Sequence, residues 1–346
     1  MILKLLLFHL LFLLLSVSSA QKLSKEENSK RKITCGQGLK LKSGYGRKVL
    51  NGLRTKIEDA PWNVAIEIET KDVGLCTGTL ISTRHVITAR HCFAHLMDYG
   101  YVSIGKNQLI HGCENDNDED LVLHGNLTNS FRIYTGTGCG YRKYCKGMNS
   151  TSVGIKKIIL PKVCDDKQLD FDDFAIVELS ESLKMSRKDR FICVNHEDSN
   201  LFNENNRMQL FGFGIDPSAG NQSAGPLRSE TVKAEKCFTT TGKAFCTKSI
   251  SKNQLACTGD SGGGVVQLIN DRVTVVGVIY EGVTCEASTT DEQDYVANVA
   301  YYSDDICRYA GICDKYPDSK AIEKARSHSS INIYIISNLL LLAQML

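Results

Sequence analysis

Short apolar runs alternate with polar turns along most of the 346 residues, and this pattern predicts an all-β protein. The runs are rich in β-branched residues: PWNVAIEIET, GTLISTRHVITA, FAIVELS, MQLFGFG, GGGVVQLI, RVTVVGVIY and DYVANVA. No long amphipathic helical pattern precedes residue 300. The polar segments 114–154 and 203–222 carry Gly, Asn and Asp, which is typical of surface loops. We therefore expect a β-barrel or a β-sandwich with elaborated loops.

The two ends of the chain differ from these strands. Residues 1–20 contain a lysine, then a leucine-rich run, then small residues, which is the order of a secretory signal peptide. Residues 331–346 are almost wholly apolar and follow a polar spacer, which favours a GPI-attachment signal. The tail is short for a spanning helix. A membrane or packing helix and a plain terminal extension remain alternatives.

The composition also indicates the cellular compartment of the protein. Fourteen cysteines fit an oxidising compartment, where disulfides persist. Three N-glycosylation triplets, at Asn126, Asn149 and Asn221, agree with secretion. The formal net charge is +2 and no long basic stripe occurs, so a nucleic-acid partner is not expected. We expect a secreted or cell-surface glycoprotein of one large or two small domains.

Three separated motifs carry candidate chemistry. ITARHC contains His91, FDDFAIVEL contains Asp173, and CTGDSGGG surrounds Ser261 with glycines. A serine hydroxyl is a poor nucleophile unless a general base takes its proton, and histidine is the usual base. The imidazole in turn needs a carboxylate on its other nitrogen. These three residue types together indicate nucleophilic catalysis by serine.

The acidic partner must be chosen between two adjacent aspartates. On a strand, Asp173 shares a face with Ala175 and Val177, whereas Asp172 lies on the face of Glu178. We therefore expect Asp173 to be buried and to act as the partner of the imidazole. A solvated acid at a strand end is the alternative.

In order and local context, the three motifs resemble those of the trypsin-like (chymotrypsin-fold) serine proteases, over residues 49–306. The resemblance is to a divergent, secreted branch of the nematode type. It implies two packed six-stranded antiparallel β-barrels with a short C-terminal helix, and a serine endopeptidase that uses His91, Asp173 and Ser261. The N–H groups of Gly259 and Ser261 would form the oxyanion hole. An esterase of another fold is disfavoured, because those enzymes place the serine before the acid and the histidine.

The resemblance also implies activation by cleavage. RKVLNG precedes APWNVAI, so a cut after Lys48 would free Val49, whose ammonium group would pair with Asp260. The family's usual start is Ile-Val-Gly-Gly, and Val-Leu-Asn-Gly differs from it, so the alternative of no cleavage stays open. The expected segments are a signal peptide 1–20, a propeptide 21–48, a protease domain 49–306, an extension 307–330 and a hydrophobic tail 331–346.

Cysteine positions match the family's bridges. The resemblance implies the pairs Cys76–Cys92, Cys257–Cys285, Cys237–Cys246 and Cys35–Cys193, the last tethering the propeptide after cleavage, and Cys307 with Cys313 would close a small loop. The remaining four permit three pairings that the sequence does not separate: Cys113, Cys139, Cys145 and Cys164. No compact zinc-type spacing occurs, so no metal and no cofactor are expected. The acidic run 114–120 has calcium-binding residue types, but a solvated loop is favoured.

The substrate pocket departs from the family pattern. The resemblance assigns to it Leu255, Ala256, Tyr280, Glu281, Gly282 and Asp294. Because leucine replaces the pocket-floor aspartate of trypsin, an apolar or aromatic preference is expected first. Asp294 would recruit a basic side chain, which is the second preference. The expected partners are protein or peptide substrates, an activating protease and protein inhibitors, with membrane contact only through a GPI anchor.

Arg90 also departs from the pattern, since the family usually has a small residue directly before the histidine. A guanidinium held beside the imidazole would oppose its protonation unless it points to solvent. This residue keeps open an alternative function, that of a catalytically inactive homologue acting as a protein-binding module.

Overall fold

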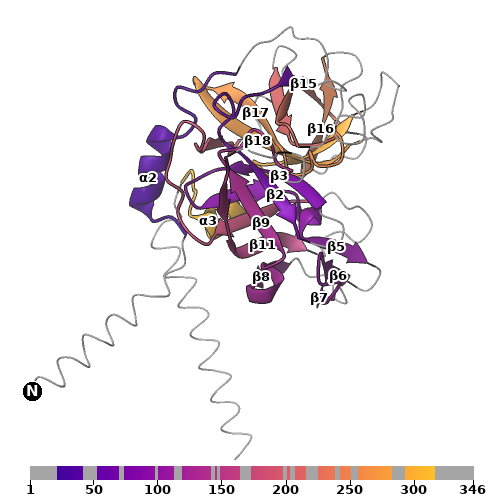
Figure 1. Ribbon diagram of the computed structural model, residues 1–346. Helices are drawn as coiled ribbons and strands as arrows, with labels where there is room; N and C mark the ends of the chain where they lie inside the picture. The colour runs from indigo at the N-terminus through magenta and orange to yellow at the C-terminus, as the bar shows by residue number, and fades with distance from the viewer. Residues whose placement is uncertain are drawn as a thin grey trace, which may run out of the picture. The chain divides into compact units, whose positions relative to one another are not determined.

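Strands dominate the structure and form two eight-stranded sheets and a three-stranded sheet (Figure 1). The computed structural model describes residues 22–41, 53–69, 74–97, 100–112, 119–141, 145, 149–163, 173–197, 201–202, 207–215, 225–237, 242–250, 256–282 and 293–315. All these sheets belong to one unit, Met1–Ile312. The second unit, Cys313–Leu346, has no helix or strand in its described residues 313–315.

The first sheet contains the strand that precedes His91 and the strand that follows Asp173. In spatial order they are β10 (Thr151–Val153), β9 (Phe131–Thr135), β2 (Asn63–Ile68), β3 (Gly74–Leu80), β4 (His85–Thr88), β12 (Ala175–Leu179), β11 (Ile155–Val163) and β8 (Glu119–His124). β4 and β12 pair antiparallel, with Thr88 opposite Ala175. The small sheet contains β5 (Ala94–Met97), β6 (Gly100–Ser103) and β7 (Leu109–His111).

The second sheet closes on itself. Its main strands are β14 (Met208–Gly212), β15 (Arg228–Glu235), β16 (Ala244–Ser249), β17 (Gly264–Ile269), β18 (Arg272–Glu281) and β19 (Asp294–Asn298). Because β16 pairs with both β19 and β15, these six strands form a ring without a free edge. β1 (Leu53–Arg54) adds antiparallel to β15, and β13 (Cys193–Val194) adds parallel to β18.

The all-β, two-barrel architecture expected from the sequence is confirmed, with two differences in detail. The first sheet has eight strands. The segments 114–154 and 203–222 are not wholly loops, since β8, β9 and β10 lie in the first and β14 in the second. Short alternating runs such as DLVLH supply enough apolar positions for a strand, although the flanking residues are polar.

One hydrophobic core cluster contains residues of both sheets, and a second, smaller cluster lies mainly within the second sheet. Trp62, fully buried before β2, makes an edge-to-face contact with Phe211 of β14 at 5.2 Å between ring centroids. The short C-terminal helix α3 (Ser303–Ala310) ends at Gly311, whose φ of 72° is the left-handed conformation typical of helix ends. Before α3, Tyr302 stacks on Phe174 at 4.2 Å. Phe174 is adjacent to Asp173, so this packing supports the acidic member of the site.

One helix was not predicted. α2 (Lys25–Thr34) begins with a capping box, in which Ser24 and Glu27 each accept a hydrogen bond from the other's backbone N–H. It lies beside the sheets in Figure 1. The helix falls in the segment expected to be a propeptide.

Disulfides connect distant parts of the fold. The structure contains Cys35–Cys193, Cys76–Cys92, Cys237–Cys246 and Cys139–Cys145. The last of these selects one of the three pairings left open by the sequence. Cys257, Cys307 and Cys313 are also in disulfides. Cys113, Cys164 and Cys285 lie outside the described residues, and the pairs Cys257–Cys285 and Cys307–Cys313 stay predictions.

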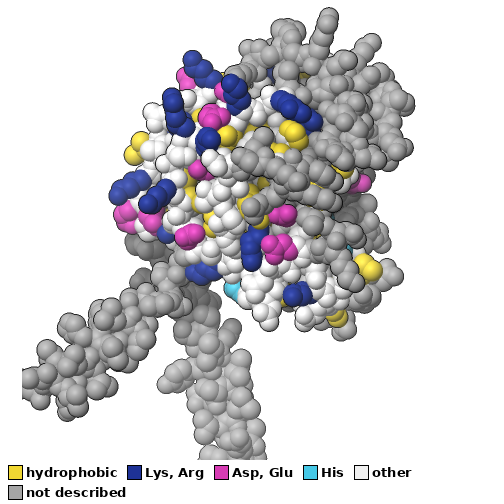
Figure 2. Space-filling view, viewed as in Figure 1, with side chains coloured by type: hydrophobic (Ala, Val, Ile, Leu, Met, Phe, Trp, Pro, Cys, Tyr) yellow, Lys and Arg dark blue, Asp and Glu magenta, His cyan; other side chains and the backbone are white. Residues whose placement is uncertain are grey.

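The surface is mixed in charge. Figure 2 shows basic and acidic side chains interspersed over the described part of this face, without a broad field of one sign. Among the described residues, none of the helices has the length and apolar content needed to cross a bilayer. Asn126 and Asn149 are exposed, as an attached glycan would require, and Asn221 lies outside the described residues.

Candidate active site

His91 and Asp173 lie side by side at the ends of neighbouring strands. His91 is in a short 3-10 turn (Arg90–Cys92) that follows β4, and Asp173 comes just before β12. The Nδ1 of His91 is 2.6 Å from Oδ2 of Asp173, and the backbone N–H of His91 donates to Oδ1 at 2.9 Å. Both carboxylate oxygens are therefore used to orient the imidazole.

The electrostatics of this pair favour an ionised aspartate. Burial raises the pKa of the Asp173 carboxyl, but the charge and hydrogen bond of His91, followed by the Arg90 guanidinium, outweigh it and leave the pKa below its ordinary value. An ionised carboxylate can only accept, so Nδ1 carries a proton, and in the neutral imidazole Nε2 is then the acceptor. About a third of the His91 side chain is exposed, whereas Asp173 is buried.

Ser261 belongs to a loop that is held against β3. The backbone N–H of Thr77 donates to the carbonyl of Ser261 at 2.8 Å, and the Thr77 hydroxyl donates to the carbonyl of Gly259 at 2.8 Å. Cys76, the neighbour of Thr77, is bonded to Cys92, the neighbour of His91. The serine loop and the histidine turn are therefore attached to adjacent residues of β3, Thr77 and Cys76.

Two glycines let the loop approach this closely. Gly259 and Gly262 have φ of 99° and 84°, which side chains rarely permit. A Cβ on Gly262 would lie 2.0 Å from the Thr88 hydroxyl, so no larger residue fits there. Among the described residues, the amides of Gly259 and Ser261 have no hydrogen-bond acceptor. They can donate to a bound oxyanion.

Arg90 does not point to solvent. Its residue exposure is 3%, and its guanidinium carbon lies 5.0 Å from the ring centroid of Tyr101, which is also buried. A cation over an aromatic face is stabilised by the ring's quadrupole. The positive charge is thus held next to the His91–Asp173 pair.

Asp260 occupies an enclosed position behind the serine loop. Its carboxyl accepts hydrogen bonds from the backbone of Gly214 at 2.7 Å and Cys257 at 3.0 Å. Burial raises its pKa to about 6, although these bonds and the charge of Arg228 act in the opposite direction. Lys48 and Val49, its expected activation partners, lie outside the described residues.

The pocket residues are partly brought together. Asp294, which is 1% exposed, accepts a hydrogen bond from the backbone of Ala256 at 3.1 Å, and a Cβ on Gly282 would lie 3.3 Å from its Oδ1. Tyr280 is buried and Glu281 is exposed. Leu255 lies outside the described residues. The structure thus places an aspartate between the two segments expected to line the pocket.

Behind Asp294 lies a second buried acid. Glu230 on β15 is 3% exposed, and burial, followed by the charge of Asp294, raises its pKa to about 8. Its neighbours also include Asp260, which raises the pKa further, and the hydroxyl of Ser249, which lowers it. This shift favours the protonated form of Glu230 at neutral pH.

Sequence reasoning missed two kinds of contributor. Thr77 lies directly before the apolar run GTLISTRHVITA. Its hydroxyl contacts Gly259, which is 182 residues away, and sequence spacing gives no signal of such a contact. Arg228 and Glu230 lie in the polar run RSET at the start of β15, so nothing in the sequence distinguished them from solvated positions.

One group of residues has metal-ligating types. Within the described ranges, Cys76, His91 and Cys92 offer ligand atoms within 4.8 Å of one another. The two sulfurs are joined in a disulfide, so neither is a thiolate that could bind a metal. These three residues therefore do not indicate a metal site.

Two antiparallel β-barrels, with a His–Asp pair and a glycine-rich serine loop attached to one strand, define a trypsin-like serine protease homologue. The chain belongs to the nematode trypsin-6-like family, whose model matches residues 4–313. This membership confirms the expected divergent, trypsin-like relationship.

Individual relatives are distant. A venom serine protease of Polistes dominula is 26% identical over 275 residues, covering 76% of this chain and 82% of that protein. The trypsin-like protease try-5 of Caenorhabditis elegans is 24% identical over 250 residues, covering 65% and 74%. Rat tissue-type plasminogen activator is 24% identical over 261 residues, covering 69% of this chain, which spans 41% of its length.

Proposed function

We propose that this chain is a serine endopeptidase, secreted or held at the cell surface, and made as a zymogen. The proposal depends on one observation. The buried Asp173 carboxylate accepts hydrogen bonds from Nδ1 and from the backbone N–H of His91. Such a pair holds Nδ1 on the carboxylate, so that Nε2 is the ring atom that would accept a proton. The attachment of the Ser261 loop to β3 supports the same function.

In this mechanism His91 Nε2 takes the proton from the Ser261 hydroxyl as the oxygen attacks the peptide carbonyl carbon. The amides of Gly259 and Ser261 stabilise the oxyanion, where the loss of one donor typically costs about 3 kcal/mol of barrier. His91 then gives the proton to the leaving amine. Water, activated by the same imidazole, releases the acyl group. Asp173 holds the tautomer and stabilises the transient imidazolium.

Activation would follow a cut after Lys48. The freed ammonium of Val49 would enter the enclosed site of Asp260, where a buried carboxylate with a raised pKa favours a new cationic partner. This pairing would order the oxyanion loop, because Asp260 lies directly before Ser261.

Primary specificity is proposed to be apolar or aromatic first, because position 255 is leucine. The position of Asp294 beside Ala256 and Gly282 supports the second preference, for a basic side chain. Peptide substrates with phenylalanine or lysine before the scissile bond separate the two. If lysine is preferred and Asp294→Asn abolishes that preference, the apolar assignment is wrong.

A fluorophosphonate probe tests catalysis directly. Protein cut after Lys48 should be labelled, and the label should vanish in Ser261→Ala. The buried charge of Arg90 beside the imidazole favours a second candidate, an inactive homologue that binds proteins. Well-folded, cut protein that takes no label would support that candidate and reject the enzyme.

The proposed location of the protein is supported by its two terminal segments, its disulfides and its glycosylation sites. A leader at residues 1–20, the disulfides and exposed acceptor asparagines support secretion. Mass spectrometry of the mature C-terminus tests the GPI anchor, and an intact Leu346 would reject it.

A further inference from the structure

Residues 22–41 cover a surface formed by both barrels and by α3. At one end, the N–H of Leu23 donates to the carbonyl of Ala310 at 2.9 Å. At the other end, Gly36 donates to the carbonyl of Phe191 at 3.3 Å and accepts from Val273 of β18 at 3.2 Å. Three segments far apart in sequence are therefore contacted by one short stretch.

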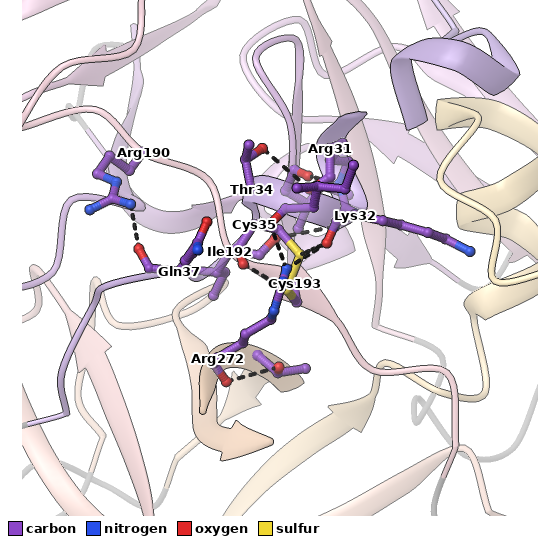
Figure 3. The surroundings of a disulfide bond; sticks show 12 residues. Arg31, Lys32, Thr34, Cys35, Gln37, Arg190, Ile192, Cys193 and Arg272 are labelled. Carbon is purple, nitrogen blue, oxygen red and sulfur yellow. Dashed lines mark hydrogen bonds between the residues drawn. A yellow bond between two sulfur atoms is a disulfide. The ribbon is translucent and has the colours of Figure 1, made fainter. Parts of the chain in front are cut away.

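A buried arginine is the central contact. Arg31 of α2 is 5% exposed, and its guanidinium donates to the carbonyls of Ile81 at 2.5 Å and Ile192 at 3.2 Å. Both carbonyls belong to loops of the barrels, and a buried carbonyl that loses its donor is costly. The guanidinium of Arg31 therefore connects the helix to two loops at once (Figure 3).

The body of the protein in turn holds the end of α2. Arg272 donates to the carbonyls of Lys32 and Ile33 at 2.5 and 2.9 Å, where the last turn of a helix lacks internal partners. Arg190 donates to the carbonyl of Gln37 at 2.5 Å. Figure 3 shows these contacts around the Cys35–Cys193 disulfide.

The backbone itself is shaped for this surface. Gly36 has a φ of 59°, and a Cβ there would lie 2.2 Å from the carbonyl oxygen of Val273. At the other end of the helix, Arg84 donates to Glu27 at 2.9 Å. A ten-residue helix is marginal in water by itself, so its order comes from docking.

From these contacts we propose that residues 22–41 are a permanent second chain of the mature protein, bound across the two barrels by noncovalent contacts that do not need the disulfide. The protein cut at residue 48 is then a stable two-chain molecule, and this segment is not a propeptide that leaves. The proposal does not depend on the proposed catalysis, but it rests on the proposed cleavage after Lys48.

The test uses the full chain with Cys35→Ser, Cys193→Ser and Ser261→Ala, and with a site for a specific protease placed within residues 44–48. After the cut, gel filtration at micromolar concentration is followed by mass spectrometry of the fractions. We expect the peptide to co-elute with the body. Arg31→Met should raise the released fraction at least tenfold, whereas Lys30→Met, on the exposed face of the same helix, should not change it.

Release of the peptide from the cut triple variant that keeps Arg31 would overturn the proposal. Equal release from the Arg31→Met and Lys30→Met proteins would also overturn it. Hydrogen exchange on the disulfide-bonded Ser261→Ala chain provides a second measurement that needs no cysteine variant. The α2 amides should be equally protected before and after the cut. Loss of their protection on cutting would also overturn it.

Discussion

Arg90 places a buried positive charge beside the His91–Asp173 pair. The side chain is buried over Tyr101, and its charge helps to keep the pKa of Asp173 below the ordinary value. A positive charge beside the His91–Asp173 pair opposes the uptake of a further proton. The site should therefore keep its reactive protonation state to lower pH than it would without Arg90.

The variant Arg90→Met tests this effect while keeping most of the side-chain volume. Removing the charge favours proton uptake by the pair, so the acidic midpoint of fluorophosphonate labelling should move up by roughly 0.5–1 pH unit. The measurement is the labelling rate of cut protein from pH 4 to 9. Arg132→Met, at a more exposed arginine, serves as the control, and an unchanged midpoint in Arg90→Met would contradict the expectation.

At the scale of elements, β3 organises the site through one hydroxyl. Thr77 donates to Gly259 and accepts from the N–H of Phe213 at 3.1 Å, whereas Thr79, two residues on, is fully buried and its hydroxyl has no partner among the described residues. The two threonines are therefore a matched pair that differ in what their hydroxyls contact.

We expect Thr77→Val to destabilise the protein by about 2 kcal/mol, because it leaves a buried N–H and a buried carbonyl unpaired. It should also slow labelling of Ser261, since the loop loses a tether. Thr79→Val should be neutral or stabilising. Urea unfolding and probe labelling measure both effects, and equal losses in the two variants would show that the hydroxyl of Thr77 has no special role.

The elements also show what sequence patterns can and cannot reveal. Alternating β-branched runs predicted eight of the nineteen strands in the described residues, because one buried face per strand leaves a period of two. α2 left no such signal, since its sequence KEENSKRKIT has Ile33 as its one aliphatic residue, and Ile33 is 65% exposed. Capping and docking stabilise this helix, and neither produces a hydrophobic stripe.

At the scale of the molecule, the sequence predicted that His91 and Asp173 would pair but not what supports them. His91 and Asp173 were paired by motif and strand parity, and both lie at the ends of strands that pair in the sheet. The buried acids behind Ser261 could not be anticipated, because their surroundings come from β14, β15, β16 and β19 together. Only closure of the second barrel brings Glu230, Asp260 and Asp294 into mutual influence.

Asp260 connects this arrangement to activation. In the uncut chain its folded pKa of about 6 is above the ordinary 3.8, so the contribution of Asp260 to stability is fully present below pH 3.8 and is lost as the pH rises through 6. A Val49 ammonium would favour the carboxylate and recover up to about 3 kcal/mol above pH 6. In Ser261→Ala protein, cutting after Lys48 should therefore stabilise more at pH 8 than at pH 5 by urea unfolding. Carbamylation of the new amino terminus should remove the gain, and a pH-independent effect would argue against the pairing.

Glu230 gives the molecule a second pH dependence, and one that needs no cleavage. Its folded pKa of about 8 exceeds the ordinary 4.5, so the folded state holds a proton that the unfolded state releases, and stability falls as pH rises from 4.5 toward 8. Glu230→Gln keeps the shape without the charge and should be more stable at pH 7 by up to about 3 kcal/mol, with a flatter pH profile. Glu181→Gln, at an exposed position, should leave the profile unchanged. If Glu230→Gln also leaves it unchanged, the carboxyl is already ionised at neutral pH, and the three acids cannot be as closely enclosed as the structure describes.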